Sequence, residues 1–412
     1  MKIAVIGSGI SGLICGYLLG KSHDLTIFEA DSKPGGHVNT VEVQGSSDRQ
    51  RVDTGFIVFN KENYPNFCRL LDVLEIESQT TRMGFSVSCE RTGFEYSGES
   101  LRGFFGSVSN LASPRHWNML REILRFHDLG QDPSACKESV EEFVATHGFG
   151  KRFIEYFLYP LGSALWSCPK EKFESFPMEF VLHFMKNHKM LQVGRRPVWR
   201  VIKGGSDNYV NKIVAQLGSR LRLNAKVASV ERLDEGVQVD LKNGESSHFD
   251  EVVLACHADQ SLRLLKDAEE EESQVLNSFP YESNLVTLHS DQSLLPKRKS
   301  AWASWNARIP KDESSKATST YSMNILQGLQ DETQFCVSLN QEDLIADESR
   351  CGDYHFSHPT YDANRAEAQR KHPAFIRRKG ISLCGAYWGY GFHEDGLSSG
   401  LKVCESFGES LA

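Results

Sequence analysis

The sequence predicts an α/β protein in which a discontinuous parallel-sheet domain carries an inserted α+β domain. A strand, a glycine-rich turn, a helix and a second strand open the chain in "KIAVIGSGISGLICGYLLGKSHDLTIFEAD". A third apolar strand, "DEVVLAC", follows far along the chain, and a fourth, "ISLCGA", lies near the C-terminus. Parallel strands that are buried on both faces form continuous apolar runs. We therefore expect these distant segments to join one Rossmann-type sheet.

The composition indicates an ordinary globular protein and excludes several classes of function. The 412 residues carry a formal net charge of −8, which argues against nucleic acid as the main partner. The ten cysteines are scattered singly, without spacing typical of a metal site, so we expect no metal and a reducing compartment. No apolar run is long enough to span a bilayer. Together with the strand that begins at the N-terminus, this favours a cytoplasmic protein without a signal peptide.

The first turn has the spacing of a dinucleotide cradle. Gly7 provides a tight turn, Gly9 allows a pyrophosphate to approach, and Gly12 lets the helix pack closely on the strand. The helix N-terminus then offers free N–H groups to the anion. Glu29 ends the second strand, where an acid accepts hydrogen bonds from a ribose diol and favours FAD or NAD over NADP. The predicted cradle comprises Gly7, Gly9, Ser11, Gly12, Glu29 and Ala30.

Two further segments favour FAD over NAD. A double glycine follows in "DSKPGGHVNT", and "RVDTGFIVFN" comes soon after; a nicotinamide enzyme needs neither. Here the chain resembles the FAD-dependent amine-oxidase-like superfamily. The resemblance implies a cofactor site that includes Gly35, Gly36, His37, Thr54, Gly55, Phe56 and Ile57. Lys33 and His37 stand where the family normally has arginines, so we expect phosphate contact to rely more on backbone N–H groups.

The middle and the end of the chain extend the resemblance. A predicted three-stranded meander contains Val227, whose backbone would touch the adenine. The tail, "CGAYWGYGFHEDGLSSG", would return to the cofactor through Gly385, Phe392, Gly396 and Leu397. We expect Gly396 and Leu397 to open the last helix, with Asp395 as its N-cap. The positive end of this helix would then face the flavin where negative charge develops on reduction.

Several motifs together give a narrower resemblance that covers essentially the whole chain. They are "YPLGSALWS", "VVLACHADQ", "AWASWN" and the tail. The chain resembles a bacterial branch similar to the N-terminal flavin domain of plant cyclopropane fatty-acid synthases. This branch includes acyl desaturases of the furan-fatty-acid route, typically encoded beside cyclopropane-synthase-like methyltransferases. The resemblance implies an FAD-dependent oxidoreductase that desaturates a membrane-lipid acyl chain by hydride transfer to flavin N5, with such a methyltransferase as a partner.

Other functions stay open at this point. One is amine oxidation, although Phe392 stands where amine oxidases commonly have a tyrosine. The others are non-redox double-bond isomerisation and a role mainly as a flavoprotein partner of the methyltransferase. Because only one GxGxxG is present, a second nucleotide site for NAD(P)H is not expected.

Side-chain roles are less specific. His393 is the best candidate for a catalytic base, since histidine titrates near neutrality and this one lies in the flavin-side motif. A structural, hydrogen-bonded histidine is the alternative. The candidates for the substrate cavity, which also fit a plain core, are Trp302, Trp305, Tyr321 and Asn324.

One amphipathic segment suggests contact with a membrane. Residues 100–126 combine large apolar side chains with arginines, a pattern that lies at a bilayer surface in some proteins. The basic clusters "PKRK" and "FIRRK" could meet anionic headgroups. A core-facing helix and solvated charges are the alternatives. The predicted location is thus the cytoplasm, with peripheral contact at the inner face of the membrane.

The same observations predict a division into two domains. The FAD-binding domain would comprise residues 1–75, 195–260 and 371–412. The substrate domain would comprise residues 76–194, mostly helical, and 261–370, with strands.

Overall fold

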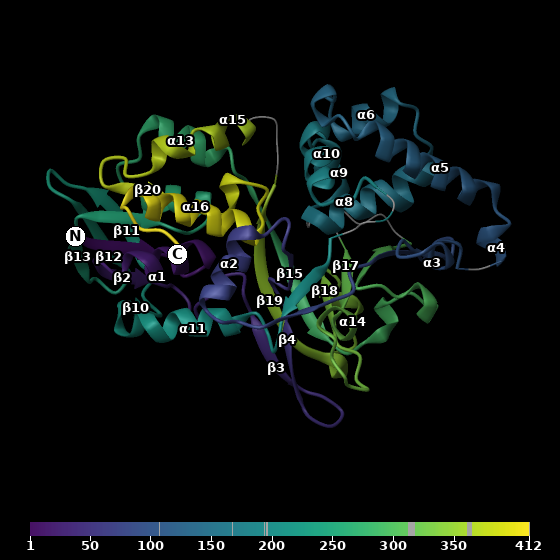
Figure 1. Ribbon diagram of the computed structural model, residues 1–412, viewed down its shortest axis with the longest axis horizontal. Helices are drawn as coiled ribbons and strands as arrows, with labels where there is room; N and C mark the ends of the chain where they lie inside the picture. The colour runs from purple at the N-terminus through teal and green to yellow at the C-terminus, as the bar shows by residue number, and fades with distance from the viewer. Residues whose placement is uncertain are drawn as a thin grey trace.

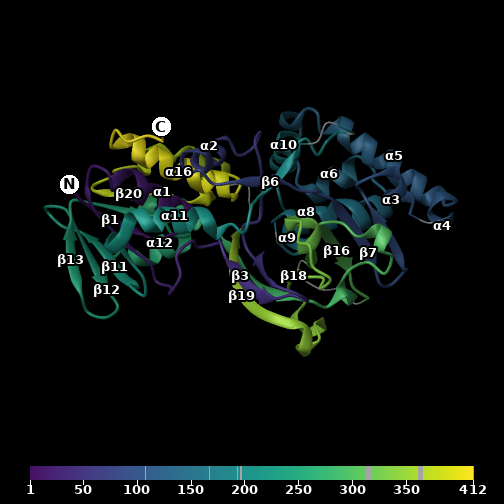
Figure 2. The same cartoon turned by 60° about the horizontal axis from the view of Figure 1, so that its bottom comes forward.

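The computed structural model describes residues 1–106, 108–166, 168–192, 194, 197–311, 318–360 and 365–411. The predicted segment ends at residues 195 and 412 lie outside the described residues. Figures 1 and 2 show two lobes, one around a sheet that holds both chain termini and one formed by helices over a second sheet.

The first lobe is built on a five-stranded, fully parallel sheet in the order β10-β2-β1-β14-β20. Its strands are β1 (Lys2–Ile6), β2 (Asp24–Phe28), β10 (Leu221–Arg222), β14 (Glu251–Leu254) and β20 (Ile381–Leu383). They come from both ends and the middle of the chain, as the apolar runs predicted, and the predicted fold class is confirmed. The division of the chain at particular residues stays a prediction.

Alternate residues of β1 face different partners, as the period of a strand requires. Ile3 and Val5 pack against helices on one face, while Ala4 and Ile6 pack against a three-stranded meander on the other. The helices are α1 (Ile10–Leu19), α2 (Pro65–Val73), α11 (Asp207–Leu217) and α16 (His393–Ser406). The meander side contains β11 (Val227–Arg232), β12 (Val237–Leu241), β13 (Ser246–Phe249), α12 (Ala258–Leu264), α13 (Glu270–Asn277) and α15 (Arg365–Arg370).

The second lobe is built on a seven-stranded sheet in the order β19-β15-β18-β17-β16-β7-β8. Its pairs are antiparallel except β16 with β7. Its strands, with the helix that follows β17, are β7 (Phe85–Cys89), β8 (Phe94–Ser97), β15 (Tyr281–His289), β16 (Trp305–Ile309), β17 (Ser319–Ser322), α14 (Met323–Gln327), β18 (Cys336–Leu339) and β19 (Arg350–Pro359). Two small sheets connect the lobes through β3 (Thr40–Gln44), β4 (Arg49–Asp53), β5 (Val58–Asn60), β6 (Ser78–Thr80) and β9 (Trp199–Ile202).

Helices α3 to α10 cover one face of the seven-stranded sheet (Figures 1 and 2). They are α3 (Leu101–Phe105), α4 (Val108–Leu111), α5 (Pro114–Leu129), α6 (Val140–Thr146), α7 (Lys151–Phe153), α8 (Tyr159–Trp166), α9 (Lys170–Glu174) and α10 (Met178–Asn187). A π-helical turn, Ile154–Leu158, joins α7 to α8, and the carbonyl of Tyr156 in this turn accepts a hydrogen bond from the Tyr96 hydroxyl at 2.7 Å. This bond ties the helical layer to the sheet.

Two local expectations were wrong in detail. The last helix begins at His393, one turn earlier than predicted, and Asp395 lies in its first turn. The Asp395 carboxylate accepts a hydrogen bond from the Phe392 N–H at 2.8 Å, so it reaches back to the N-cap residue instead of being that residue. In the segment 261–370, which was expected to contain strands, β17 ends at Ser322 and the chain continues as the helix α14.

Among the described residues, no helix is both long enough and apolar enough to cross a bilayer.

Candidate functional site

A cavity of about 1860 Å³ runs between the two lobes. Its lining includes the glycine-rich turn after β1 at one end and apolar residues of α5 and α8 at the other. Sites for one small ligand measure up to about 1,000 Å³. The cavity therefore has room for a dinucleotide and a second molecule.

The glycine-rich turn presents an open helix end to this cavity. Gly7 has a positive φ of 100°, and its N–H donates to the Phe28 carbonyl at 2.9 Å. A Cβ built on Gly9 would meet no atom within 4 Å, so the space beside this residue is open. No side chain caps the N-terminus of α1, and its first turn contains no acid. The first N–H groups of the helix are thus available to an anion.

Glu29 lies at the predicted edge of the cradle. Its carboxylate accepts hydrogen bonds from the Ser8 N–H at 2.8 Å, the Ser8 hydroxyl at 2.5 Å and the Asp31 N–H at 3.0 Å. Ala30 and Val227 line the cavity beside it. A carboxylate fixed in this way can accept a ribose diol with its remaining lone pairs.

The double glycine packs directly on the glycine-rich turn. Gly35 and Gly36 both have positive φ values, 120° and 59°. A Cβ on Gly36 would lie 3.0 Å from the Gly9 Cα, which is tighter than ordinary contact. A side chain at either position would therefore strain the backbone that encloses the phosphate site.

His37 does not replace a family arginine as a cation. Its ring lies among His257, His358 and Phe356, with centroid separations of 5.7, 5.5 and 5.2 Å. Its Nε2 lies 3.1 Å from the Ser357 carbonyl oxygen. Burial lowers the pKa of His37, so the ring is neutral near pH 7. This histidine cluster has no counterpart in the sequence analysis, because its members are far apart along the chain.

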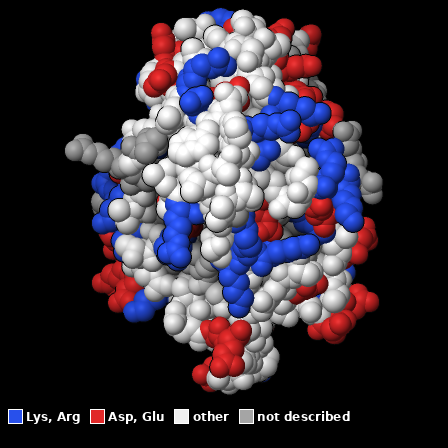
Figure 3. Space-filling view, turned by 90° about the vertical axis from the view of Figure 1, so that its right-hand side faces the viewer, with Lys and Arg blue, Asp and Glu red and all other residues white. Residues whose placement is uncertain are grey.

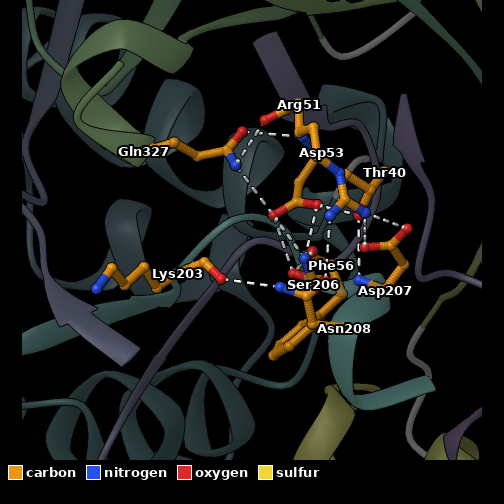
Figure 4. A network of polar contacts seen from close by, with 9 residues as sticks. All are labelled: Thr40, Arg51, Asp53, Phe56, Lys203, Ser206, Asp207, Asn208 and Gln327. Atoms are coloured by element: carbon orange, nitrogen blue, oxygen red, sulfur yellow. Dashed lines mark hydrogen bonds and ion pairs between the residues drawn. The ribbon is translucent and has the colours of Figure 1, made fainter. Parts of the chain in front are cut away.

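A buried carboxylate holds the segment Thr54–Ile57 against the cavity (Figure 4). Asp53 accepts hydrogen bonds from the Ser206 N–H at 2.9 Å, the Thr40 hydroxyl at 2.6 Å and the Gln327 amide at 3.2 Å. The Ser206 hydroxyl lies 2.9 Å from the Phe56 carbonyl oxygen. Burial raises the pKa of Asp53 to about 6, and the hydrogen bonds from Thr40 and Ser206 oppose this shift. Asp53 is thus a positioning residue, and the sequence analysis did not select it.

Residues of the tail take two different positions. Gly385 and Phe392 line the cavity, and the Phe392 ring stacks on Phe184 of α10 at 4.9 Å. Gly12, Gly396 and Leu397 are not part of the lining. Gly396 lies under α1, where its carbonyl accepts a hydrogen bond from the Ser11 hydroxyl at 2.7 Å. Gly396 and Ser11 therefore support the cradle through the contact between α1 and α16.

His393 lines the cavity but belongs to a packed aromatic cluster. Its ring stacks on Phe56 at 3.8 Å with an interplanar angle of 10° and meets Phe67 edge-on at 5.0 Å. Its Nε2 lies 2.8 Å from the Tyr209 hydroxyl. Burial lowers the pKa of His393 to about 3. These contacts argue against its predicted role as general base and favour a positioning role.

Two of the four substrate candidates lie at the cavity. Trp305 and Tyr321 line it as a cross-strand pair with ring centroids 5.7 Å apart. Trp302 and Asn324 do not line it. The Trp302 indole N–H donates to the Pro296 carbonyl at 2.7 Å, and the Asn324 side chain holds the turn before β18 by accepting from the Phe335 N–H at 2.8 Å. Both side chains are held by backbone groups of neighbouring segments, Trp302 by Pro296 and Asn324 of α14 by Phe335.

The helical end of the cavity is apolar, and four of its residues lie in the amphipathic segment 100–126 that the sequence indicated as a membrane contact. The residues of this end are Phe104, Leu120, Ile123, Leu124, Phe157, Leu161, Leu165, Trp166 and Phe184. Their helical spacing predicts an apolar face but not whether that face meets a core or a cavity. Among the described lining residues of α3 to α10 and the loop after α10, Lys189 is the only Lys or Arg, and it pairs with Glu62.

A family model and a curated relative both match the chain. The model of the flavin-containing amine oxidoreductase family matches residues 10–299. The L-amino acid dehydrogenase of Synechocystis sp. is 22% identical over 266 residues, which are 58% of this chain and 53% of that protein. The chain thus spans about half the length of this curated relative.

Solved structures resemble the chain over nearly its whole length. A CLA-producing fatty acid isomerase from P. acnes superimposes with a TM-score of 0.70 at 15% identity, covering 98% of each chain. Cyclohexylamine oxidase from Brevibacterium oxydans IH-35A superimposes with a TM-score of 0.68 at 14% identity, again covering 98% of each chain. At these identities the likeness shows a shared fold.

Proposed function

Because the chain belongs to the flavin-containing amine oxidoreductase family, we propose that it is an FAD-dependent oxidoreductase that desaturates a fatty-acyl chain of a membrane lipid. The family assignment confirms the predicted cofactor and the enzyme class. The apolar helical end of the cavity supports desaturation of an acyl chain, since this end continues from the cofactor cradle.

The residues present fit FAD. The open turn at Gly9 and the end of α1 would hold the pyrophosphate, and Glu29 would hold the adenosine ribose. Thr54–Ile57 and Phe392 would lie beside the ring system. When bound, FAD supplies an acceptor for a hydride from one carbon of the acyl chain, while the neighbouring carbon releases a proton.

The chain's own residues would bind and orient the substrate. Phe104, Leu161 and Trp166 offer apolar surface to a long hydrocarbon chain and exclude water from it. Phe392 and Phe184 form an aromatic wall where this region meets the cofactor cradle. The proton released by the substrate has no assigned base among these side chains.

The same region disfavours an amino-acid substrate. A substrate carboxylate at this end needs a cation close by, and Lys189, the only Lys or Arg among the described lining residues of α3 to α10 and the loop after α10, is already paired with Glu62. Fatty-acid double-bond isomerisation uses a similar substrate, and the fold is shared with a fatty acid isomerase. Isomerisation is therefore the second candidate, and the two differ in whether the flavin remains reduced.

Anaerobic reduction of the flavin tests the proposal. Purified protein is mixed without oxygen with phospholipids that carry unsaturated chains, and the flavin absorbance is followed. A desaturase loses its yellow colour and yields a product with one more double bond. An isomerase yields a shifted double bond without lasting bleaching, and a protein that bleaches only with amines contradicts the proposal.

A cavity-filling variant adds specificity to this test. Ala164→Phe places a ring among the apolar lining residues of α8 and should slow bleaching by a long acyl chain at least about tenfold. Reduction by dithionite should be unchanged, because the cofactor end is untouched. Ala145→Phe, on the exposed side of α6, is the matched control and should behave as the parent chain.

The methyltransferase partner also remains a proposal. It rests on the sequence resemblance, and co-purification of the full-length chain with a cyclopropane-synthase-like methyltransferase from the same organism tests it. Absence of a complex at micromolar concentrations, while lipid bleaching persists, would remove the partner from the proposal and leave the reaction.

A further inference from the structure

Large exposed apolar side chains concentrate on one end of the molecule. Five of the eleven among the described residues lie on or beside α3, α4 and α5, and we call them the α3–α5 surface: Leu101, Val108, Leu111, Trp117 and Leu124. Val108 is 83% exposed and Leu101 is 69% exposed. The remaining six are scattered along the chain from Met1 to Leu344. Such a concentration of exposed apolar side chains indicates a surface that meets a partner.

Cationic side chains accompany this surface. Arg102, Arg115 and Arg121 are exposed, and no ion pair involves them within the described part of the chain. Between residues 100 and 127 the only acid is Glu122, whose carboxylate accepts the Gly150 N–H at 2.7 Å. Figure 3, which views this end of the molecule, shows Lys and Arg side chains around an uncharged area. The local charge is positive although the whole chain carries −8.

A second, shallower pocket of about 630 Å³ lies beside α5 and is also cationic. Its charged residues are Arg91, Arg115, Lys151, Arg152, Glu122 and Glu155. Glu155 pairs with Arg91 at 3.8 Å and with Lys151 at 3.4 Å, while Glu122 is engaged with Gly150. The cations therefore outnumber the acids, which favours an anionic headgroup at this position.

The main cavity reaches the surface within this same area. Leu101 and Leu124 are among its lining residues and are also 69% and 42% exposed. A side chain that lines the cavity and is also exposed to solvent marks a mouth of the cavity. An apolar molecule could therefore pass from the α3–α5 surface to the region lined by Ile123 and Leu161 without crossing bulk water.

From these observations we propose that the α3–α5 surface docks on an anionic phospholipid bilayer and that an acyl chain enters the cavity between α3 and α5. The exposed apolar side chains enter the boundary between headgroups and acyl chains, while the arginines meet lipid phosphates. The docking rests on this surface alone, whereas the identity of the entering chain rests on the proposed function.

Vesicle co-sedimentation with the full flavin-loaded chain tests the docking without measuring activity. The chain should sediment with vesicles of phosphatidylcholine and phosphatidylglycerol and far less with phosphatidylcholine alone. Binding should weaken as ionic strength rises from about 0.01 M to about 1 M, because the screening length falls from about 30 Å to about 3 Å. A chain that fails to sediment with anionic vesicles at low salt overturns the proposal.

Matched variants locate the surface. Val108→Glu with Leu111→Glu should lower the affinity for anionic vesicles about tenfold or more. Leu344→Glu, at a side chain that is 50% exposed and outside this surface, should bind as the parent chain does. Arg115→Glu with Arg121→Glu should remove the preference for phosphatidylglycerol, whereas Arg220→Glu, at another exposed arginine, should retain it. If the control variants lose vesicle binding or its preference for phosphatidylglycerol while the α3–α5 variants retain them, the assignment of the surface is wrong.

Two further outcomes separate this inference from the proposed function. If vesicles bind but no lipid bleaches the flavin, the docking stands and the proposed reaction fails. If soluble fatty acids bleach the flavin but vesicles never bind, the reaction stands and the docking fails. Should Val108→Glu instead convert a dimer to a monomer without changing vesicle binding, the surface joins two copies of the chain and the inference is wrong.

Discussion

At the scale of single residues, Gly9 and Gly12 have different roles within one turn. A Cβ at Gly9 would enter open space in the cavity, whereas a Cβ at Gly12 would lie 1.9 Å from the Gly7 carbonyl oxygen. We expect Gly9→Ala to lower FAD affinity at least about tenfold while the flavin-free protein keeps its thermal midpoint. Equilibrium dialysis with FAD and a melting curve of the flavin-free chain measure the two effects.

Gly12→Ala serves as the contrast. It forces backbone atoms apart, so the flavin-free protein should itself melt at a lower temperature. Equal loss of stability in both variants would show that Gly9 supports the fold and not the ligand.

His393 is predicted to position its neighbours instead of transferring a proton. His393→Phe keeps a ring to stack on Phe56 but removes the partner of the Tyr209 hydroxyl. The free energy of unfolding should fall by about 1–3 kcal/mol, since a buried hydroxyl is left unsatisfied. Between about pH 6 and 9, the pH profile of substrate-driven flavin reduction should keep its shape.

Tyr209→Phe removes the same hydrogen bond from the other side and provides the control. The two single variants and the double variant should show coupled effects on stability. If the pH profile of substrate-driven flavin reduction loses its acidic or basic limb in His393→Phe and not in Tyr209→Phe, His393 is instead a catalytic base.

At the scale of elements, α16 caps α2 across the lobe. The Glu394 carboxylate accepts the N–H groups of Asn66 and Phe67, both at 2.9 Å, in the first turn of α2. Burial raises the pKa of Glu394, and these hydrogen bonds oppose the shift. The Glu394 oxygens thus hold the first turn of α2.

Glu394→Ala should destabilise the first turn of α2 by about 1–2 kcal/mol. Hydrogen exchange of the α2 amides should become faster, with little change in the five-stranded sheet. Glu405→Ala, at an exposed position on the same helix, should leave that exchange unchanged. Uniform faster exchange in the whole lobe would contradict a local capping role.

Close contact between α1 and α16 also depends on Gly400 of α16, which is far in sequence from the residues of α1 that it meets. A Cβ on Gly400 would lie 2.5 Å from the Ile14 Cγ2 and 2.8 Å from the Ser11 carbonyl oxygen. The tail glycines thus serve helix packing as well as the cofactor site, which the motif alone did not indicate.

At the scale of the whole molecule, buried histidines link stability to pH. Burial lowers the pKa of His257 to about 4 and of His358 to about 3, and the neighbouring His37 adds to each shift. In the unfolded chain a histidine takes up its proton near pH 6.5. As the pH falls below about 6.5, the unfolded chain binds protons that the folded chain excludes, so stability decreases.

Three carboxyl groups act in the opposite direction. Burial raises the pKa values of Asp53 and Asp395 to about 6 and also raises the pKa of Glu394, so the folded chain retains their protons at a pH where the unfolded chain loses them. Six histidines that are buried or half-buried have pKa values lowered to about 3 or 4, and they outnumber these three groups. The thermal midpoint of the flavin-free protein should therefore decrease as the pH is lowered from about 7.5 to about 5.

His358→Gln should reduce this pH dependence by up to about 1.4 kcal/mol per pH unit, which corresponds to one proton. Melting curves at several pH values measure the slope. His183→Gln, at a half-exposed histidine on α10, is the matched control variant. A midpoint that rises on acidification would contradict the dominance of the histidines.

Sequence reasoning predicted the parts of the site that depend on local patterns. Gly7, Gly9 and Glu29 follow from the order of strand, turn and strand, and the structure places all three at the cavity. Trp302 was wrongly selected, because an aromatic residue on a predicted strand does not reveal where its N–H finds a partner. Asp53 was missed, since two of its partners, Ser206 and Gln327, lie more than a hundred residues away.

The sequence by itself determined the dinucleotide cradle and four of the five strands of the parallel sheet, because glycine spacing and continuous apolar runs are short-range consequences of backbone geometry and burial. Only the tertiary structure decided which apolar helix faces line a cavity and which form a core. It also decided that His37 and His393 lie against aromatic rings, and that Leu101 and Leu124 both line the cavity and are exposed. The physical reason is that burial and pKa depend on neighbours brought together from distant segments, which no local pattern specifies.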